Sequence, residues 1–193
     1  HVREQRALNH IMSVLKANGK KYENYHLPQI EPDPIFAHLL QQRAKEEARD
    51  KVAEMAPLLT AEQAEIAEAI VASIFDASAP ARLFCVMGSG GCGKTFLYKF
   101  IDYWCLMNDV NVACCAYTGI AATLLPNGLT AHTTFGIPLT DDLSSKIPRI
   151  DATKGKGKRL ADTDVLIWDE ISMVPAELFR FTERACQQSA KNG

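Results

Sequence analysis

The sequence predicts an α/β domain with a mostly parallel sheet, preceded by a helical segment. Short apolar runs typical of buried strands occur at residues 83–87, 110–117 and 165–168. Between the first two runs, residues 95–107 carry apolar side chains at helical spacing. A strand, a helix and further strands in this order are the pattern of a parallel sheet that is covered by helices.

Composition places the chain among ordinary globular proteins. Its 193 residues are 47% hydrophobic and 23% charged, and 21 Lys+Arg against 23 Asp+Glu give a net charge of −2. This balance excludes a generally basic nucleic-acid coat, although it allows a local basic patch. No apolar run is long enough to span a bilayer, so we expect no membrane partner. The six cysteines show no C-x-x-C spacing, which predicts a reducing, intracellular compartment and no structural zinc.

The first part of the chain, residues 1–57, is expected to be a helical extension with a linker. Apolar residues at helical spacing predict a helix over 2–17. The proline-rich stretch 27–34 cannot be helix interior and predicts an extended linker. A second helix is expected to begin after Asp33 as N-cap and to end before Pro57. No motif in this part performs chemistry.

The second part, residues 58–193, is expected to form the α/β domain. Thr60 opens a helix whose apolar residues lie on one face, and Pro80 ends that unit. The helix 95–107 is followed by a turn at Asn108. The chain has no initial Met and stops without an obvious domain ending, so we expect a fragment.

The most specific motif is a glycine-rich loop that fits G-x-x-x-x-G-K-[ST], namely Gly88-Ser89-Gly90-Gly91-Cys92-Gly93-Lys94-Thr95. It lies between a predicted strand and a predicted helix, the context that a phosphate-binding loop requires. Glycines let backbone N–H groups approach phosphate, and the helix N-terminus adds partial positive charge. Lys94 would reach the β- and γ-phosphates of ATP, and the Thr95 hydroxyl would ligate Mg²⁺. The alternative is a glycine-rich turn without a ligand.

Cys92 lies inside this loop. Its position beside Lys94 and a helix start suggests a reactive thiol that ATP would protect. The alternative, which we favour, is an inert small residue at an unconstrained position. Equal alkylation rates with and without ATP would exclude the first hypothesis.

Two carboxylates, Asp169 and Glu170, follow the third predicted strand. Residues at the carboxyl end of a buried strand lie at the sheet edge where α/β proteins bind ligands. Asp169 can hold Mg²⁺ through its water shell, and Glu170 can orient or deprotonate an attacking water. Alone, an Asp-Glu pair is often just a helix N-terminal signature. Together with the glycine-rich loop, it predicts nucleotide hydrolysis.

Gln63 has two interpretations. The spacing T-x-x-Q from Thr60 predicts a capping box, which the residues alone favour. The sharper interpretation is an amide that grips the edge of adenine through one donor and one acceptor.

Three further segments have weaker signals. Hydroxyls and a histidine at strand ends in 116–122 and 130–136 suit phosphate contacts along a single nucleic-acid strand. On composition alone, ordinary N-capping is favoured for both. The locally basic stretch 146–159 is expected to be a flexible, solvated loop, with contact to a nucleic-acid backbone as the alternative.

The assembled motifs resemble the petite-integration-frequency family of superfamily 1 DNA helicases. The matching segments occur in that family's order, at residues 59–63, 88–95, 116–122, 130–137 and 166–174. The segment between Ala7 and Pro28 resembles the one that precedes this domain in members carried by Helitron rolling-circle transposons.

This resemblance implies a RecA-like P-loop NTPase domain that uses ATP and Mg²⁺. It further implies 5′-to-3′ translocation on single-stranded DNA and unwinding at duplex junctions. It makes Gln63 an expected adenine contact and supports a Mg·ATP site formed by Lys94, Thr95 and Asp169, with Glu170 as the catalytic carboxylate. It assigns DNA contacts to Thr118, His132 and Phe135. Family members act in DNA repair, recombination, telomere maintenance and replication, so the expected compartment is the nucleus or the mitochondrion.

The sequence also departs from the family. Cys92 stands where Thr is usual, a change of little consequence because backbone amides bind the phosphate. A Gly-Asp-x-x-Gln-Leu-Pro motif and the second motor domain with its arginines are absent. We therefore expect an incomplete first motor domain that binds nucleotide, hydrolyses it poorly and unwinds nothing. One alternative is a non-catalytic ATP- or DNA-binding remnant of a transposon helicase. A small P-loop kinase is another, but it leaves the segments 116–122 and 130–137 unexplained.

Overall fold

The structure is a computed structural model. It describes residues 7–8, 10–12, 14–15, 20, 22–25, 27, 34–76, 78–79, 82–139, 143, 146–148 and 150–191. The expected N-cap Asp33, most of the linker 27–34 and Pro80 lie outside the described residues. The described residues between 7 and 15 are helical, as predicted. No helix in the described part is both long and apolar enough to cross a membrane.

A three-stranded parallel sheet forms the centre of the molecule, in the order β2-β1-β3. The strands are β1 (Val112–Ala116), β2 (Leu129–Thr130) and β3 (Val165–Asp169). The last residue of β1, Ala116, is level with both Thr130 and Asp169. This arrangement confirms the predicted α/β class with a parallel sheet, and it brings the ends of all three strands to one edge.

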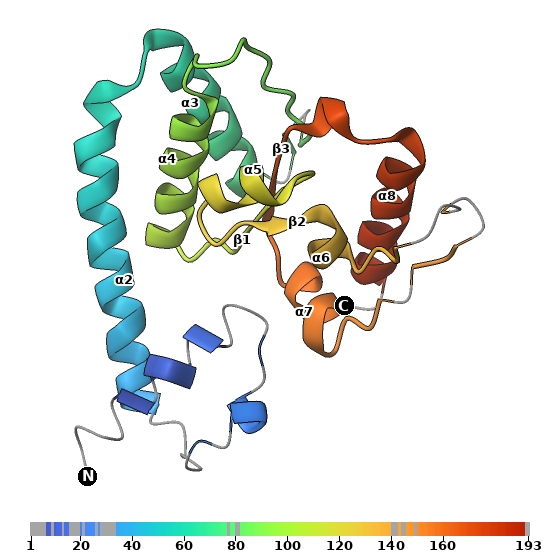
Figure 1. Ribbon diagram of the computed structural model, residues 1–193. Helices are drawn as coiled ribbons and strands as arrows, with labels where there is room; N and C mark the ends of the chain where they lie inside the picture. Colours follow the sequence, from blue (N-terminus) through green and yellow to red (C-terminus); the bar gives the residue numbers. More distant parts are fainter. Residues whose placement is uncertain are drawn as a thin grey trace.

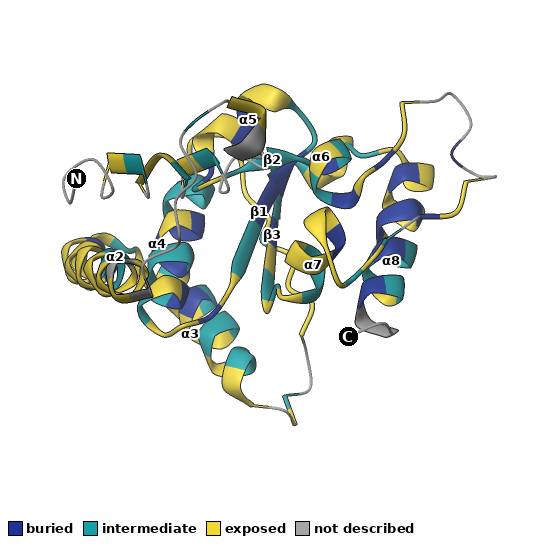
Figure 2. Ribbon diagram, turned by 90° about the horizontal axis from the view of Figure 1, so that it is seen from below, coloured by how far each residue is buried: buried dark blue, intermediate teal, exposed yellow. Residues whose placement is uncertain are grey.

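Helices cover both faces of the sheet, as Figures 1 and 2 show. On one face, Cys114 of β1 packs with Ile101 of α4 (Lys94–Met107) and with α3 (Ala61–Phe75). On the other face, Cys115 packs with Phe135 of α6 (Ala131–Phe135) and Phe181 of α8 (Ala176–Lys191). Successive strand residues point to opposite sides, so the central strand β1 has buried residues on both faces and is apolar throughout.

The helices on either side of the glycine-rich loop form as predicted. Thr60 caps α3 with a complete capping box, in which its hydroxyl accepts from the Gln63 N–H and the Gln63 side chain accepts from the Thr60 N–H. Helix α4 begins one residue earlier than expected and ends at the predicted turn, where Asn108 is its C-cap. The signals at Thr60 and Asn108 therefore predicted the start of α3 and the end of α4 correctly.

The N-terminal extension packs on this domain through helix α2 (Pro34–Met55), which lies along α4 (Figure 1). Ala48 and Met55 are buried, and Lys45 forms an ion pair with Asp109 in the turn after α4. Helix α2 ends at Met55, before Pro57 as predicted, and a short 3₁₀ helix η2 (Ala56–Leu58) follows. Another 3₁₀ helix, η1, spans Tyr22–Tyr25. The division of the chain at residue 57 stays a prediction.

The prediction of a buried strand at 83–87 is wrong for the described structure. This segment has no regular structure, and Leu83 and Met87 are 88% and 87% exposed. Only Val86 of the run packs against the core. A strand exists only where a neighbouring strand pairs with its backbone, and β3 pairs with β1 alone in the described part of the chain. Apolar character alone does not supply that partner.

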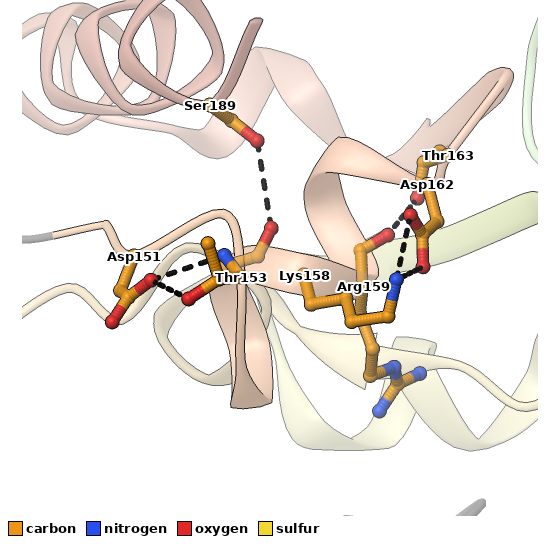
Figure 3. A network of polar contacts seen from close by, with 8 residues as sticks. Asp151, Thr153, Lys158, Arg159, Asp162, Thr163 and Ser189 are labelled. Carbon is orange, nitrogen blue, oxygen red and sulfur yellow. Dashed lines mark hydrogen bonds and ion pairs between the residues drawn. The ribbon is translucent and has the colours of Figure 1, made fainter. Parts of the chain in front are cut away.

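The basic stretch 146–159 is not a simple solvated loop, because its second half begins helix α7 (Gly155–Ala161). Asp151 accepts hydrogen bonds from the backbone and hydroxyl of Thr153 before the helix. These bonds from Thr153, and the ion pair with Lys154, lower the pKa of Asp151 to about 2. Lys158 of α7 forms an ion pair with Asp162, the C-cap residue of this helix (Figure 3).

Helix α7 is also fixed against α8. A Cβ at Gly157 would lie 2.1 Å from the carbonyl oxygen of Asp151, so only glycine fits there. The carbonyl of Gly157 accepts from the Ser189 hydroxyl of α8 at 3.5 Å (Figure 3). Two of the basic side chains in this stretch, Lys154 and Lys158, are thus engaged in ion pairs with carboxylates. The charge available for a nucleic-acid backbone is correspondingly reduced.

Asp102 is a half-buried carboxylate on α4, and burial raises its pKa to about 6. Burial also raises the pKa of the nearby Cys105 and Cys114 thiols to about 12, so they remain neutral. The folded chain binds a proton at Asp102 more tightly than the unfolded chain does. Stability is therefore lost as pH rises from about 4 to about 6, and it stays reduced above that range.

We expect Asp102→Asn to stabilise the chain above pH 6, because the neutral amide avoids the cost of a desolvated charge. The raised pKa corresponds to a loss of at most about 3 kcal/mol in the free energy of unfolding, and partial exposure of the side chain reduces this loss to about 1–2 kcal/mol. Urea unfolding of the wild type and of Asp102→Asn at pH 4 and pH 8 measures the gain in stability. The gain should appear at pH 8 and nearly vanish at pH 4, whereas the exposed-site control Asp50→Asn should show no such difference. A gain of equal size at both pH values would contradict the prediction.

Candidate functional site

The glycine-rich loop forms a tight turn directly before α4. The Cys92 N–H donates to the Ser89 carbonyl at 3.4 Å. Gly91 and Gly93 have φ values of +80° and +85°, in the left-handed region that favours glycine. An added Cβ at Gly90 would meet nothing within 4 Å, whereas one at Gly88 would lie 2.5 Å from Cys92 Sγ. The backbone conformation of this turn therefore favours glycine at positions 91 and 93.

The Lys94 ammonium lies over its own loop. Its Nζ donates to the carbonyl oxygens of Gly88 at 2.7 Å and Ser89 at 2.9 Å, and it contacts Cys92 Sγ at 3.6 Å. Lys94 and Thr95 open α4, whose first-turn N–H groups have no partners within the helix. A positive charge, free amides and the helix dipole thus converge on one loop, which is the arrangement that binds phosphate. Cys92 is exposed, and its reactivity stays a prediction.

Gln63 connects this loop to the start of α3. Its Oε1 completes the capping box, and its Nε2 donates to the Cys92 carbonyl at 3.2 Å. A Cβ at Gly93 would lie 2.5 Å from this Nε2, so the amide packs directly on the loop backbone. The cap is confirmed, whereas the adenine contact stays a prediction.

The ends of the three strands form the second part of the site. Asp169 is level with Ala116, so Glu170 and Thr118 both lie just beyond the same sheet edge. The Thr118 hydroxyl donates to Glu170 Oε2 at 3.0 Å and accepts from the Ala121 N–H as the cap of α5 (Gly119–Leu124). This contact joins residues that are 52 positions apart in the sequence.

The backbone of Glu170 is held in an unusual conformation. It has φ 55° and ψ 32°, the left-handed region that non-glycine residues rarely adopt. Its N–H donates to Asp169 Oδ1 at 2.9 Å, and its carbonyl accepts from Met173 in the 3₁₀ helix η3 (Ile171–Met173). Such conformations persist where surrounding bonds fix them, and they concentrate at functional sites.

The two parts of the site approach each other beside the first turns of α4, where Tyr98 lies in the same hydrophobic cluster as Ala116 of β1. Burial raises the pKa of Tyr98 to about 12, and the nearby carboxylate of Asp169 adds to this effect. Tyr98 lies one helical turn beyond Lys94, so Asp169 approaches the face of α4 that follows the loop. In the described part of the chain, no three His, Cys, Asp or Glu side chains could hold a metal together. Thr95 and Asp169 supply oxygen donors, the ligand type that Mg²⁺ prefers, and a Mg²⁺ site formed by these two residues stays a prediction.

The three residues that are expected to contact DNA differ in how deeply the structure buries them. Thr118 and His132 are half-buried near the sheet edge, and a role in DNA binding stays a prediction for both. Phe135 cannot stack on a base, because its ring is 1% exposed and packs on Trp168 with centroids 5.3 Å apart. The expectation for Phe135 is therefore wrong: its side chain belongs to the core between the sheet and α8.

Sequence reasoning missed two contacts of this site and one half-buried carboxylate farther along α4. The contacts from Thr118 to Glu170 and from Gln63 to Cys92 join distant segments, and no local pattern reveals them. Asp102 did have a signal in the sequence, since it interrupts an apolar run on a predicted helix.

The fold and the loop define a class: this is an α/β domain of partial RecA-like architecture that carries a P-loop motif. The sequence model of the PIF1-like helicase family matches residues 58–192. The chain belongs to the PIF1-like helicase family.

Two curated relatives illustrate this membership. The chain is 36% identical over 106 residues to the ATP-dependent DNA helicase Pif1 of Psychrobacter sp. (strain PRwf-1), covering 54% of this chain and 16% of the relative. It is 37% identical over 99 residues to the ATP-dependent DNA helicase PIF3 of Trypanosoma brucei brucei (strain 927/4 GUTat10.1), covering 51% of this chain and 11% of the relative. The chain thus matches only a small part of the length of these relatives.

Proposed function

We propose that this chain is the nucleotide-binding part of an ATP-dependent DNA helicase. The observation that carries the proposal is the loop at residues 88–95, with left-handed Gly91 and Gly93 and the Lys94 ammonium held above it. Membership of the PIF1-like family supports ATP as the nucleotide and DNA as the substrate. Single-stranded DNA, duplex junctions and 5′-to-3′ movement belong to the proposal for the whole protein, as does action on nuclear or mitochondrial DNA.

The residues have distinct roles in this proposal. Lys94 and the amides of the loop bind the β- and γ-phosphates, replacing the carbonyl contacts that Lys94 makes here. Thr95 and Asp169 would hold Mg²⁺, which neutralises charge on phosphate oxygens. Glu170 orients the attacking water and accepts its proton. Its Oε2 accepts from Thr118, and we assign the water to the other carboxylate oxygen, Oε1.

Glu170→Gln tests the catalytic assignment. The amide keeps the size of the side chain but cannot accept a proton, so hydrolysis should fall by a factor of about 10²–10⁴. Affinity for Mg·ATP should change by less than about twofold, because Glu170 is not assigned to binding. Single-turnover hydrolysis with the chain in excess over labelled ATP measures the rate, and calorimetry measures the affinity. A variant that hydrolyses as fast as the wild type would contradict the role of Glu170.

The alternative function is a binding module without catalysis. The two functions differ in one measurable respect. A binding module would still bind ATP in a Lys94-dependent manner, but the wild type and Glu170→Gln would hydrolyse ATP at the same slow rate. The contact between Thr118 and Glu170 favours the enzyme, because it positions a carboxylate that a binding module would not need.

A further inference from the structure

We infer that Gln63 is a positioning residue for the phosphate loop and acts on phosphate binding independently of the base. This inference rests on the proposed function and assigns a new role within its site. The sequence offered Gln63 only as a helix cap or as an adenine contact. The structure shows a third contact, from Nε2 to the Cys92 carbonyl at 3.2 Å.

The consequence follows from the geometry of one peptide group. The Cys92 carbonyl and the Gly93 N–H belong to the same trans peptide, since the described chain has no cis bond. In a trans peptide the C=O and N–H point in opposite directions. By holding the carbonyl on its own side, Gln63 aims the Gly93 N–H to the opposite side of the loop. In the described part of the chain, this N–H has no hydrogen-bond acceptor.

The contact is also closely packed. Gly93 has φ +85°, and a Cβ there would lie 2.5 Å from Gln63 Nε2. A peptide with a glycine on one side rotates easily, because glycine restricts neither φ nor ψ. Gln63 restrains this rotation from outside the loop. Its own amide is fixed in turn, because Oε1 accepts from the Thr60 N–H at 3.0 Å.

The test uses inorganic tripolyphosphate with Mg²⁺, a probe without a base. Gln63→Met keeps a side chain of similar shape but removes the donor to Cys92. We expect this variant to bind Mg·tripolyphosphate and Mg·ATP more weakly by the same factor, about threefold to tenfold, which is the range for one lost hydrogen bond. Calorimetry on the full chain measures both affinities. The matched control is Thr60→Ala, which removes the hydroxyl cap but leaves the Gln63 amide on the loop. It should lower the melting temperature without changing either affinity.

The outcomes separate the possible roles. If Gln63→Met weakens the binding of Mg·ATP but not that of Mg·tripolyphosphate, Gln63 is only a base contact, and the inference is overturned. Equal losses in Thr60→Ala would assign the effect to the helix cap and would overturn it too. A second measurement uses the wild type, where the amide resonance of Gly93 should shift on adding Mg·tripolyphosphate; an unmoved resonance contradicts the inference even if the variant does not fold. If tripolyphosphate does not bind in a Lys94-dependent manner, the proposed function itself fails.

Discussion

Replacing Lys94 by alanine is expected to remove most of the affinity of the chain for Mg·ATP. The ammonium is the only side-chain cation placed on the loop among the described residues, and its Nζ already contacts two loop carbonyls. A hydrogen bond to a charged group contributes about 1.5–3 kcal/mol, and Lys94 would make more than one to phosphate. The dissociation constant should therefore rise by at least about tenfold to a hundredfold, as measured by calorimetric titration.

Lys99→Ala is the matched control for this experiment. It removes the same charge from the same helix, but its side chain is exposed and lies more than one turn beyond the loop. Its ATP affinity should stay within about twofold of the wild type, because a distant exposed charge is screened by salt. Equal losses in the two variants would indicate a general charge effect, and an unchanged affinity in Lys94→Ala would place the nucleotide elsewhere.

Phe135→Ala is expected to have the largest effect on stability. The ring is 1% exposed, packs on Trp168 and joins β1 to α8 through the second hydrophobic cluster. Truncating a buried phenylalanine costs about 3–5 kcal/mol, because it removes buried apolar area and leaves a cavity. This is a large fraction of the roughly 5–15 kcal/mol that stabilises a typical domain. Urea unfolding followed by tryptophan fluorescence measures the loss.

Phe179→Ala provides the comparison, since its ring also contacts Trp168 but is 43% exposed. We expect this variant to lose about 1 kcal/mol of stability, because the Phe179 ring buries a smaller area. A Phe135→Ala variant with wild-type stability and weakened oligo-dT binding would restore Phe135 as a DNA contact and would contradict its place in the core.

The features that the sequence predicts correctly are those with local signals. Thr60 marks the start of α3, Asn108 marks the end of α4, and the glycines of residues 88–95 mark a turn that needs left-handed backbone. Each signal depends on residues within a few positions of one another. Capping, helical periodicity and backbone freedom are all properties of such short segments.

The features that it misses depend on distant parts of the chain. Residues 83–87 are apolar enough for a buried strand, but strand formation requires a partner that sequence periodicity does not reveal. The family resemblance implied a DNA contact for Phe135, whereas its ring fills the core behind Trp168, and this packing depends on residues far away in the sequence. The contact from Thr118 to Glu170 spans 52 positions and follows only from the register of β1 and β3.

Hydrogen–deuterium exchange of the full chain, with and without Mg·ATP, tests the central claim most directly. ATP bound at the proposed site should slow exchange in the peptides that cover residues 88–98, the start of α3 and the segment after β3. Exchange in α7 and the second half of α8 should not change, because these elements lie on the other side of the sheet from α4. Slower exchange confined to α7 and α8, or no change anywhere at saturating ATP, would contradict the assignment of the loop as the nucleotide site.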